Sequence, residues 1–130
     1  MPDVSDPARA LNVLFVEDND YLREVIGMLL EEENVRLVSC ASAEEAQAEL
    51  ARTSFDAILT DVSLPRISGT ELAKRVLAEK PDAWIVFSSG YVLDHGLTRL
   101  GPNVRSLTKP FEVDALQALL AEIRADVLGA

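Results

Sequence analysis

Short apolar runs alternate with longer amphipathic segments along the chain, and this alternation predicts five β-strands and five helices. The strands are predicted at residues 11–16, 35–40, 57–60 and 84–87, with a short fifth strand that ends before Lys109. The helices are predicted at 20–33, from Ser42 to about Arg52, from after Gly69 to before Pro81, and at about 112–127. A further helix within 90–105 would be short or frayed, because Gly96, Gly101 and Pro102 interrupt a weak apolar stripe.

The predicted strands are continuously apolar rather than alternating. Such strands are buried on both faces, as in a parallel sheet that helices cover on each side. Strands that alternate with helices along the chain are joined by crossover connections. The pattern therefore predicts one doubly wound α/β domain.

Composition and charge narrow the class of protein. The 130 residues, 48% of them apolar and 26% charged, suit one folded domain. The net charge of −10 argues against general nucleic-acid binding, which needs a basic surface. There is no visible signal peptide, no apolar run near the roughly 20 residues that span a bilayer, and a single cysteine, Cys40. We therefore expect a cytoplasmic protein without membrane insertion, with a flexible tail at 1–9 and the domain at 10–128, followed by no output domain.

Three acids follow predicted strands at the point where each strand ends. Glu17 and Asp18 come directly after the first strand, and Asp61 comes directly after the third. If these strands are parallel neighbours, the acids converge at the edge where open α/β sheets bind ligands. Like charges held that close disfavour one another unless a cation or a proton intervenes. A hard divalent ion such as Mg²⁺ suits an all-oxygen acidic cluster.

Two more predicted strands end in polar groups. Ser88 and Ser89 follow the fourth strand, and Lys109 follows the fifth and precedes Pro110. Solvation of the surface does not explain polar groups at four of five strand ends. A lysine beside carboxylates can screen the charge of a phosphoryl group, so that a carboxylate can act as a nucleophile toward phosphorus.

With these motifs in combination, the chain resembles a receiver domain of a two-component response regulator, over about residues 10–128. The resemblance implies the flavodoxin-like receiver fold, a five-stranded parallel sheet in the order 2-1-3-4-5. In the segment Thr60-Asp61-Val62-Ser63-Leu64-Pro65, with Gly69 beyond, Asp61 matches the aspartate that accepts a phosphoryl group from a phosphohistidine. Asp18 matches the direct Mg²⁺ ligand, Glu17 its neighbour that acts through water, and the Ser63 backbone carbonyl a further ligand.

The remaining site residues follow from the same resemblance. Lys109, in a Lys-Pro-Phe pattern, matches the lysine that pairs with the phosphoryl oxygens. Ser89 matches the hydroxyl that bonds the phosphoryl group, and Ser88 is its competitor, although Ser89 precedes Gly90 where the family has a small residue. Implied partners are a sensor histidine kinase or a histidine phosphotransfer protein, and a downstream protein that docks on the 90–128 face. The domain would be a phosphoacceptor that promotes its own phosphorylation and dephosphorylation, not an enzyme.

The chain departs from the family at one position. Many receivers carry a Tyr or Phe three residues before the lysine, and here that position is Ser106. Tyr91 could substitute, because Phe87-Ser88-Ser89-Gly90-Tyr91 resembles the Phe-Ala-Thr-Gly-Tyr motif of receivers linked to HWE-type kinases.

Three alternatives remain at this point. A phosphatase of the haloacid dehalogenase type would carry a second acid two residues after its nucleophile, where this chain has Ser63. A flavin-binding domain would need a phosphate-binding loop after the first strand, where Glu17 and Asp18 would repel phosphate. A receiver-like scaffold that never accepts a phosphoryl group is the third.

Overall fold

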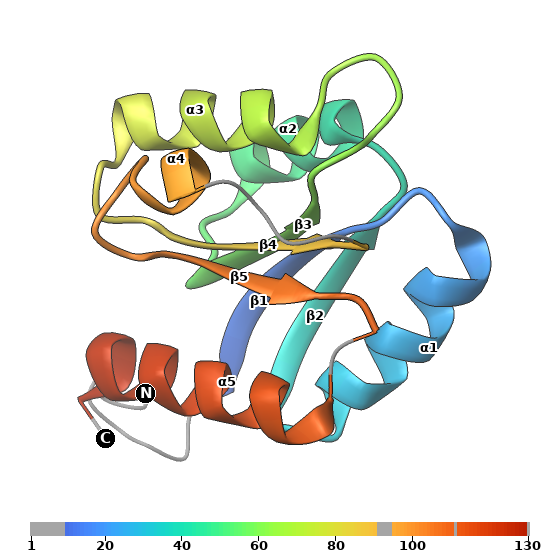
Figure 1. Cartoon of the computed structure of the whole chain (residues 1–130). Coiled ribbons are helices and arrows are strands. Elements are labelled where there is room, and N and C mark those ends of the chain that lie inside the picture. Colours follow the sequence, from blue (N-terminus) through green and yellow to red (C-terminus); the bar gives the residue numbers. More distant parts are fainter. Residues whose placement is uncertain (1–9, 91–94, 111, 130) are drawn as a thin grey trace.

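A five-stranded parallel sheet forms the centre of the computed structural model, which describes residues 10–90, 95–110 and 112–129 (Figure 1). The strands are β1 (Leu11–Val16), β2 (Val35–Cys40), β3 (Ala57–Asp61), β4 (Trp84–Ser89) and β5 (Val104–Thr108). Their order is β2-β1-β3-β4-β5, and each neighbouring pair is parallel. The predicted fold class is therefore confirmed. The tail predicted at 1–9 and the position of Tyr91 lie outside the described residues.

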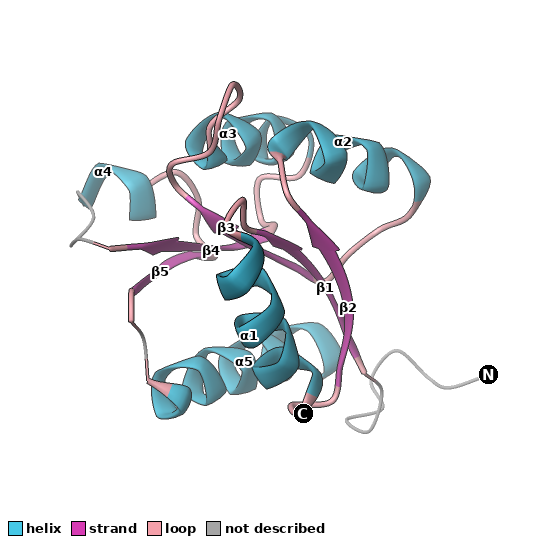
Figure 2. Ribbon diagram, turned by 90° about the vertical axis from the view of Figure 1, so that its right-hand side faces the viewer, coloured by secondary structure: helices cyan, strands magenta, loops and turns pink. Residues whose placement is uncertain are grey.

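Helices cover both faces of the sheet (Figures 1 and 2). They are α1 (Asp20–Glu31), α2 (Ala43–Arg52), α3 (Gly69–Glu79), α4 (His95–Thr98) and α5 (Val113–Leu128). One face packs on α1 and α5 through a core that includes Phe15, Leu59 and Val86, whereas α2, α3 and α4 lie on the other face. Each helix in the described part of the chain is too short or too polar to cross a bilayer.

The ends of several elements differ slightly from the predicted ones. α4 is a single turn, as the weak stripe indicated. α1 ends at Glu31 rather than at residue 33, since further acids at a helix C-terminus oppose its dipole and no basic residue lies in the last turn. β4 continues through Ser89, because strand pairing rather than hydropathy sets its end.

Local capping interactions fix where the helices near the site begin. The Asn19 side chain accepts a hydrogen bond from the Leu22 N–H at 3.0 Å and starts α1 directly after the acids. Ser42 caps α2 in the same way by accepting from the Glu45 N–H at 3.2 Å, and the segment Ser42-Ala43-Glu44-Glu45 is a capping-box sequence. These side chains satisfy N–H groups that have no partner within the helix. They therefore determine where each helix axis begins relative to the strand ends.

Gly69, the first residue of α3, packs directly against the end of β3. A Cβ atom at this position would lie 1.8 Å from the Asp61 backbone oxygen, and the Gly69 N–H donates to the Val62 carbonyl at 3.0 Å. Only a residue without a side chain allows this approach. The contact places the start of α3 against the last residue of β3.

Cys40 ends β2 as a buried packing residue. Burial, followed by the charges of Glu45 and Glu49, raises the pKa of the Cys40 thiol to about 11. The thiol is therefore protonated at neutral pH and is a poor nucleophile.

We expect Gly69→Ala to lower the free energy of unfolding by about 2–4 kcal/mol, because the added methyl group overlaps the Asp61 carbonyl. Gly27→Ala in α1 is the matched control. Its Cβ would meet Leu37 at an ordinary 3.4 Å, and alanine favours the helix over glycine. Urea unfolding of both variants measures the difference, and equal stability of Gly69→Ala and the wild type would contradict this packing argument.

Candidate functional site

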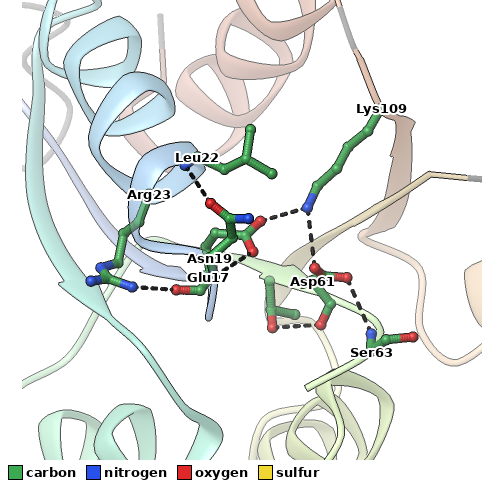
Figure 3. Close-up of polar contacts among 8 residues, drawn as sticks. Glu17, Asn19, Leu22, Arg23, Asp61, Ser63 and Lys109 are labelled. Carbon is green, nitrogen blue, oxygen red and sulfur yellow. Dashed lines mark hydrogen bonds and ion pairs between the residues drawn. The ribbon is translucent and has the colours of Figure 1, made fainter. Parts of the chain in front are cut away.

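The three predicted acids meet at the carboxyl edge of the sheet. Figure 3 shows two of them, Glu17 and Asp61. Glu17 and Asp18 follow β1, and Asp61 is the last residue of β3, the strand beside it. Carboxylate oxygens of all three lie within 4.8 Å of one another. The chain turns from β2 back across β1 to β3 at this point, so the site occupies the position where the strand order reverses.

Lys109, which follows the edge strand β5, contacts two of these acids. Its Nζ lies 2.5 Å from Glu17 Oε1 and 3.1 Å from Asp61 Oδ2 (Figure 3). β5, which is two strands away from β3, delivers the ammonium, and the Lys109–Pro110 peptide bond that follows is cis. The lysine therefore supplies the positive charge that the acidic cluster needs.

Backbone N–H groups hold the other oxygens of the same two carboxylates. Glu17 Oε2 accepts from the Asn19 N–H at 3.1 Å, and Asp61 Oδ1 accepts from the Ser63 N–H at 3.1 Å. The Glu17 side chain is only 1% exposed, so its hydrogen bonds to the Asn19 N–H and to Lys109 replace water that its carboxylate has lost. Asp18, in contrast, is exposed.

Arg23 is a site neighbour that sequence reasoning missed. Its Nη1 donates to the Glu17 backbone carbonyl at 2.9 Å, and its Nη2 pairs with exposed Asp20 at 2.6 Å. The sequence contained a signal for this role: Arg23 lies in the first turn of a helix that begins directly after the acids at the end of the first strand. The guanidinium fixes the backbone between β1 and α1, where Glu17 and Asp18 lie.

The two serines at the end of β4 occupy different register positions. Ser88 is in register with Asp61, and Ser89 is the next residue, in register with Thr108. Both are buried, and the Ser89 carbonyl accepts a hydrogen bond from the Lys109 N–H. The structure thus brings every predicted site residue to one edge of the sheet.

The electrostatics of the cluster favour the charged form of the lysine. Burial alone would lower the pKa of the Lys109 ammonium, but hydrogen bonds to Glu17 and Asp61, together with their charges, raise it above its ordinary value. The lysine is therefore fully protonated at neutral pH. The three carboxylates are hard oxygen donors at a spacing that fits one small divalent cation, with Glu17 and Asp61 already shared with the lysine.

Lys109→Met should lower the free energy of unfolding by about 1–3 kcal/mol at pH 7, because it leaves the buried Glu17 carboxylate without its cation. Lys74→Met, at an exposed position of α3, is the control and should change little. The pKa of the Lys109 ammonium is raised above 10.5, its value in an unfolded chain. Its contribution is therefore fully present below pH 10.5 and is lost as pH rises through the folded pKa. Urea unfolding should show a constant difference between wild type and variant from pH 7 to about 10 that shrinks above it; a difference that grows above pH 10.5 would refute the pairing.

Comparisons with known proteins agree with this geometry. The model of the response regulator receiver domain matches residues 13–121. The chain is 38% identical over 84 residues to protein-glutamate methylesterase/protein-glutamine glutaminase 1 of Syntrophus aciditrophicus. The matched region covers 63% of this chain and 24% of that protein. It is 27% identical over 124 residues to response regulator receiver protein CpdR of Brucella abortus. That match covers 91% of this chain and 98% of CpdR.

A solved structure supports the fold independently. Chemotaxis response regulator CheY4 of Vibrio cholerae matches with a TM-score of 0.78 at 23% identity, covering 88% of this chain and 98% of that one. The chain spans only 24% to 36% of the length of the first methylesterase relatives that it matches, and nearly the whole of CpdR. The residues matched by the family model include most of β1, all of β2 to β5 and the acidic edge between them, and the chain belongs to the response regulator receiver domain family.

Proposed function

We propose that this chain accepts a phosphoryl group on Asp61 from a histidine kinase or a histidine phosphotransfer protein and then signals by binding a partner or by relaying the group. The observation that carries the proposal is the Lys109 ammonium, which contacts both Asp61 and Glu17. A lysine held against a strand-end carboxylate and a second, buried acid is the arrangement that aspartyl phosphorylation needs.

In the proposed reaction, an Asp61 carboxylate oxygen attacks the phosphorus atom of a phosphohistidine. The O–P bond forms as the N–P bond breaks, and the imidazole leaves with the electron pair. Lys109 stabilises the charge on the phosphoryl oxygens, and the Ser89 hydroxyl bonds to one of them. The Ser63 N–H, which donates to Asp61 Oδ1, holds the carboxylate in a fixed orientation.

Receiver domains normally bind Mg²⁺ at their acidic pocket, and the donor set of this chain fits the ion. Asp18, Asp61 and the Ser63 carbonyl would be protein ligands, and Glu17 would act through water. The ion would neutralise charge that the incoming phosphoryl group adds to an already acidic edge. Glu17 keeps its hydrogen bond to Lys109 in the structure, which suits a role at one remove from the ion.

Two surfaces are proposed for partners. The 90–128 face includes β5, which is the edge strand of the sheet, and α5 beside it; a downstream protein would dock there. α1, which starts beside the acids, exposes Tyr21 at 73% and Met28 at 61%, on one side of the helix. This apolar stripe would receive the phosphodonor, because α1 begins directly after Glu17 and Asp18. The relation to receivers with the Phe-Ala-Thr-Gly-Tyr motif stays a prediction.

The competing functions are less well supported. A haloacid dehalogenase type phosphatase lacks its second acid, since Ser63 occupies that position and its N–H bonds to Asp61. The methylesterase relatives support only the receiver assignment, because the match covers 24% of the first of them. A scaffold without phosphorylation would account for the stabilising pair of Glu17 with Lys109, but it gives no role to the second contact of Lys109, with the partly exposed Asp61.

Incubation with Mg²⁺ and a small acyl phosphate should add one phosphoryl group, detected as intact mass. Asp61→Asn should gain none, because the nucleophile is removed, while Asp20→Asn should gain one, because that acid is exposed and lies outside the cluster. A wild type that gains no group, or an Asp61→Asn variant that still gains one, would refute Asp61 as the acceptor.

Mg²⁺ should raise the melting temperature of the wild type. At a concentration ten times Kd the ion stabilises the folded state by about 1.4 kcal/mol, equivalent to several degrees. Asp18→Asn should remove most of this response, because a ligand is lost. Glu31→Gln, at the far end of α1, should respond as the wild type does. Equal Mg²⁺ responses of the Asp18 and Glu31 variants would exclude Asp18 as a ligand.

A further inference from the structure

Ser88 carries a buried hydroxyl that the proposed phosphotransfer does not use. The residue is 1% exposed, and its Oγ atom has no hydrogen-bond partner among the described residues. An unpaired buried hydroxyl costs stability, and most such groups in folded proteins are paired. A serine that is kept unpaired at the edge of a functional site therefore calls for a partner that appears in another state.

The strand register places this hydroxyl beside the phosphoacceptor. Ser88 is the direct register partner of Asp61 on β3. Residues in register on neighbouring strands have their side chains on the same face of a sheet, and the strands are about 4.8 Å apart. Leu59 and Val86, two residues earlier on each strand, both belong to the core under α1 and α5. Asp61 and Ser88 continue that face to its polar end.

Ser89 lies on the opposite face, because successive side chains of a strand alternate. Phe87, two residues before it, packs in the core under α3. Ser89 must therefore reach the phosphoryl group around the end of β4. Ser88 already shares the face of Asp61, and its hydroxyl group can rotate between staggered positions on that face.

In this state each Asp61 carboxylate oxygen already accepts one hydrogen bond from another donor. Oδ1 accepts from the Ser63 N–H, and Oδ2 accepts from Lys109. Phosphorylation converts one of these oxygens into the bridging oxygen of an acyl phosphate and gives Lys109 new acceptors on the phosphoryl group. The Asp61 carboxyl group then loses a donor.

We propose that the Ser88 hydroxyl donates a hydrogen bond to the Asp61 carboxyl group of the phosphorylated domain and thereby shortens the lifetime of the aspartyl phosphate. In hydrolysis, water attacks phosphorus, the O–P bond breaks, and its electron pair goes to the Asp61 carboxylate, while the water proton leaves with inorganic phosphate or solvent. Negative charge develops on the carboxylate, and a donor held beside it stabilises that charge. The inference rests on the proposed phosphorylation of Asp61.

Two variants separate hydrogen bonding from packing. Ser88→Ala removes the donor and leaves a small space, whereas Ser88→Cys keeps a similar volume with only a weak donor. Wild type and variants are phosphorylated with Mg²⁺ and a small acyl phosphate, the donor is removed, and the remaining phosphorylated fraction is followed by intact mass. Urea unfolding of each variant is measured in parallel.

Both variants should lengthen the phosphoryl half-life by about three- to tenfold, as expected for one lost hydrogen bond to a developing charge. Ser88→Ala should unfold at a urea concentration no lower than the wild type, because it removes an unpaired group. A phosphoryl half-life of Ser88→Ala that equals or is shorter than that of the wild type overturns the inference. A second outcome also overturns it: if Ser88→Ala has a longer half-life but Ser88→Cys keeps the wild-type value, the effect comes from packing and not from the hydrogen bond.

The result distinguishes this inference from the proposed function. If the wild type gains a phosphoryl group and the Ser88 variants lose it at the wild-type rate, only the role of Ser88 is wrong. If the wild type gains none, the proposed function fails and the role of Ser88 falls with it.

Discussion

The contact of one ammonium group with two carboxylates holds the functional edge of this domain together. Lys109 reaches Glu17 across 92 residues of sequence and Asp61 across 48. These separations mean that β1, β3 and β5 must all be in place before the site exists. The same contact permits a buried Glu17, whose desolvation would otherwise oppose the folded state. The functional site is thus a product of the complete sheet and not of any local motif.

The sequence allowed the fold class, the strand and helix positions and the acidic edge to be predicted, because each depends on local patterns. Continuous apolar runs indicated buried parallel strands, and the cap at Ser42 is readable from its capping-box sequence, whereas the cap at Asn19 was not predicted. The end of β4 was not predictable in this way. Ser88 and Ser89 are polar, so hydropathy ended the strand at Phe87, whereas pairing with β5 extends it.

The contacts within the site depend on three-dimensional placement. Nothing in the order of residues indicates that Glu17 is buried while Asp18 next to it is exposed, since both follow the same strand. The role of Arg23 likewise depends on the helix axis of α1, which brings its guanidinium back to the Glu17 carbonyl. The division of the two β4 serines between opposite faces follows only once the register of β3 and β4 is known.

The hydrogen bond from the Gly69 N–H to the Val62 carbonyl closes the segment 63–68 into a loop whose two ends touch. The entropy of closing such a loop grows only slowly with its length. Its exposed residues Pro65 and Arg66 can therefore be replaced or extended while Asp61 at one end and α3 at the other keep their positions. Arg66 in this loop pairs with Glu44 on α2, so the segment lies on the surface beside the site. This loop is consequently the part of the edge at which new partner preferences can be introduced without rebuilding the site.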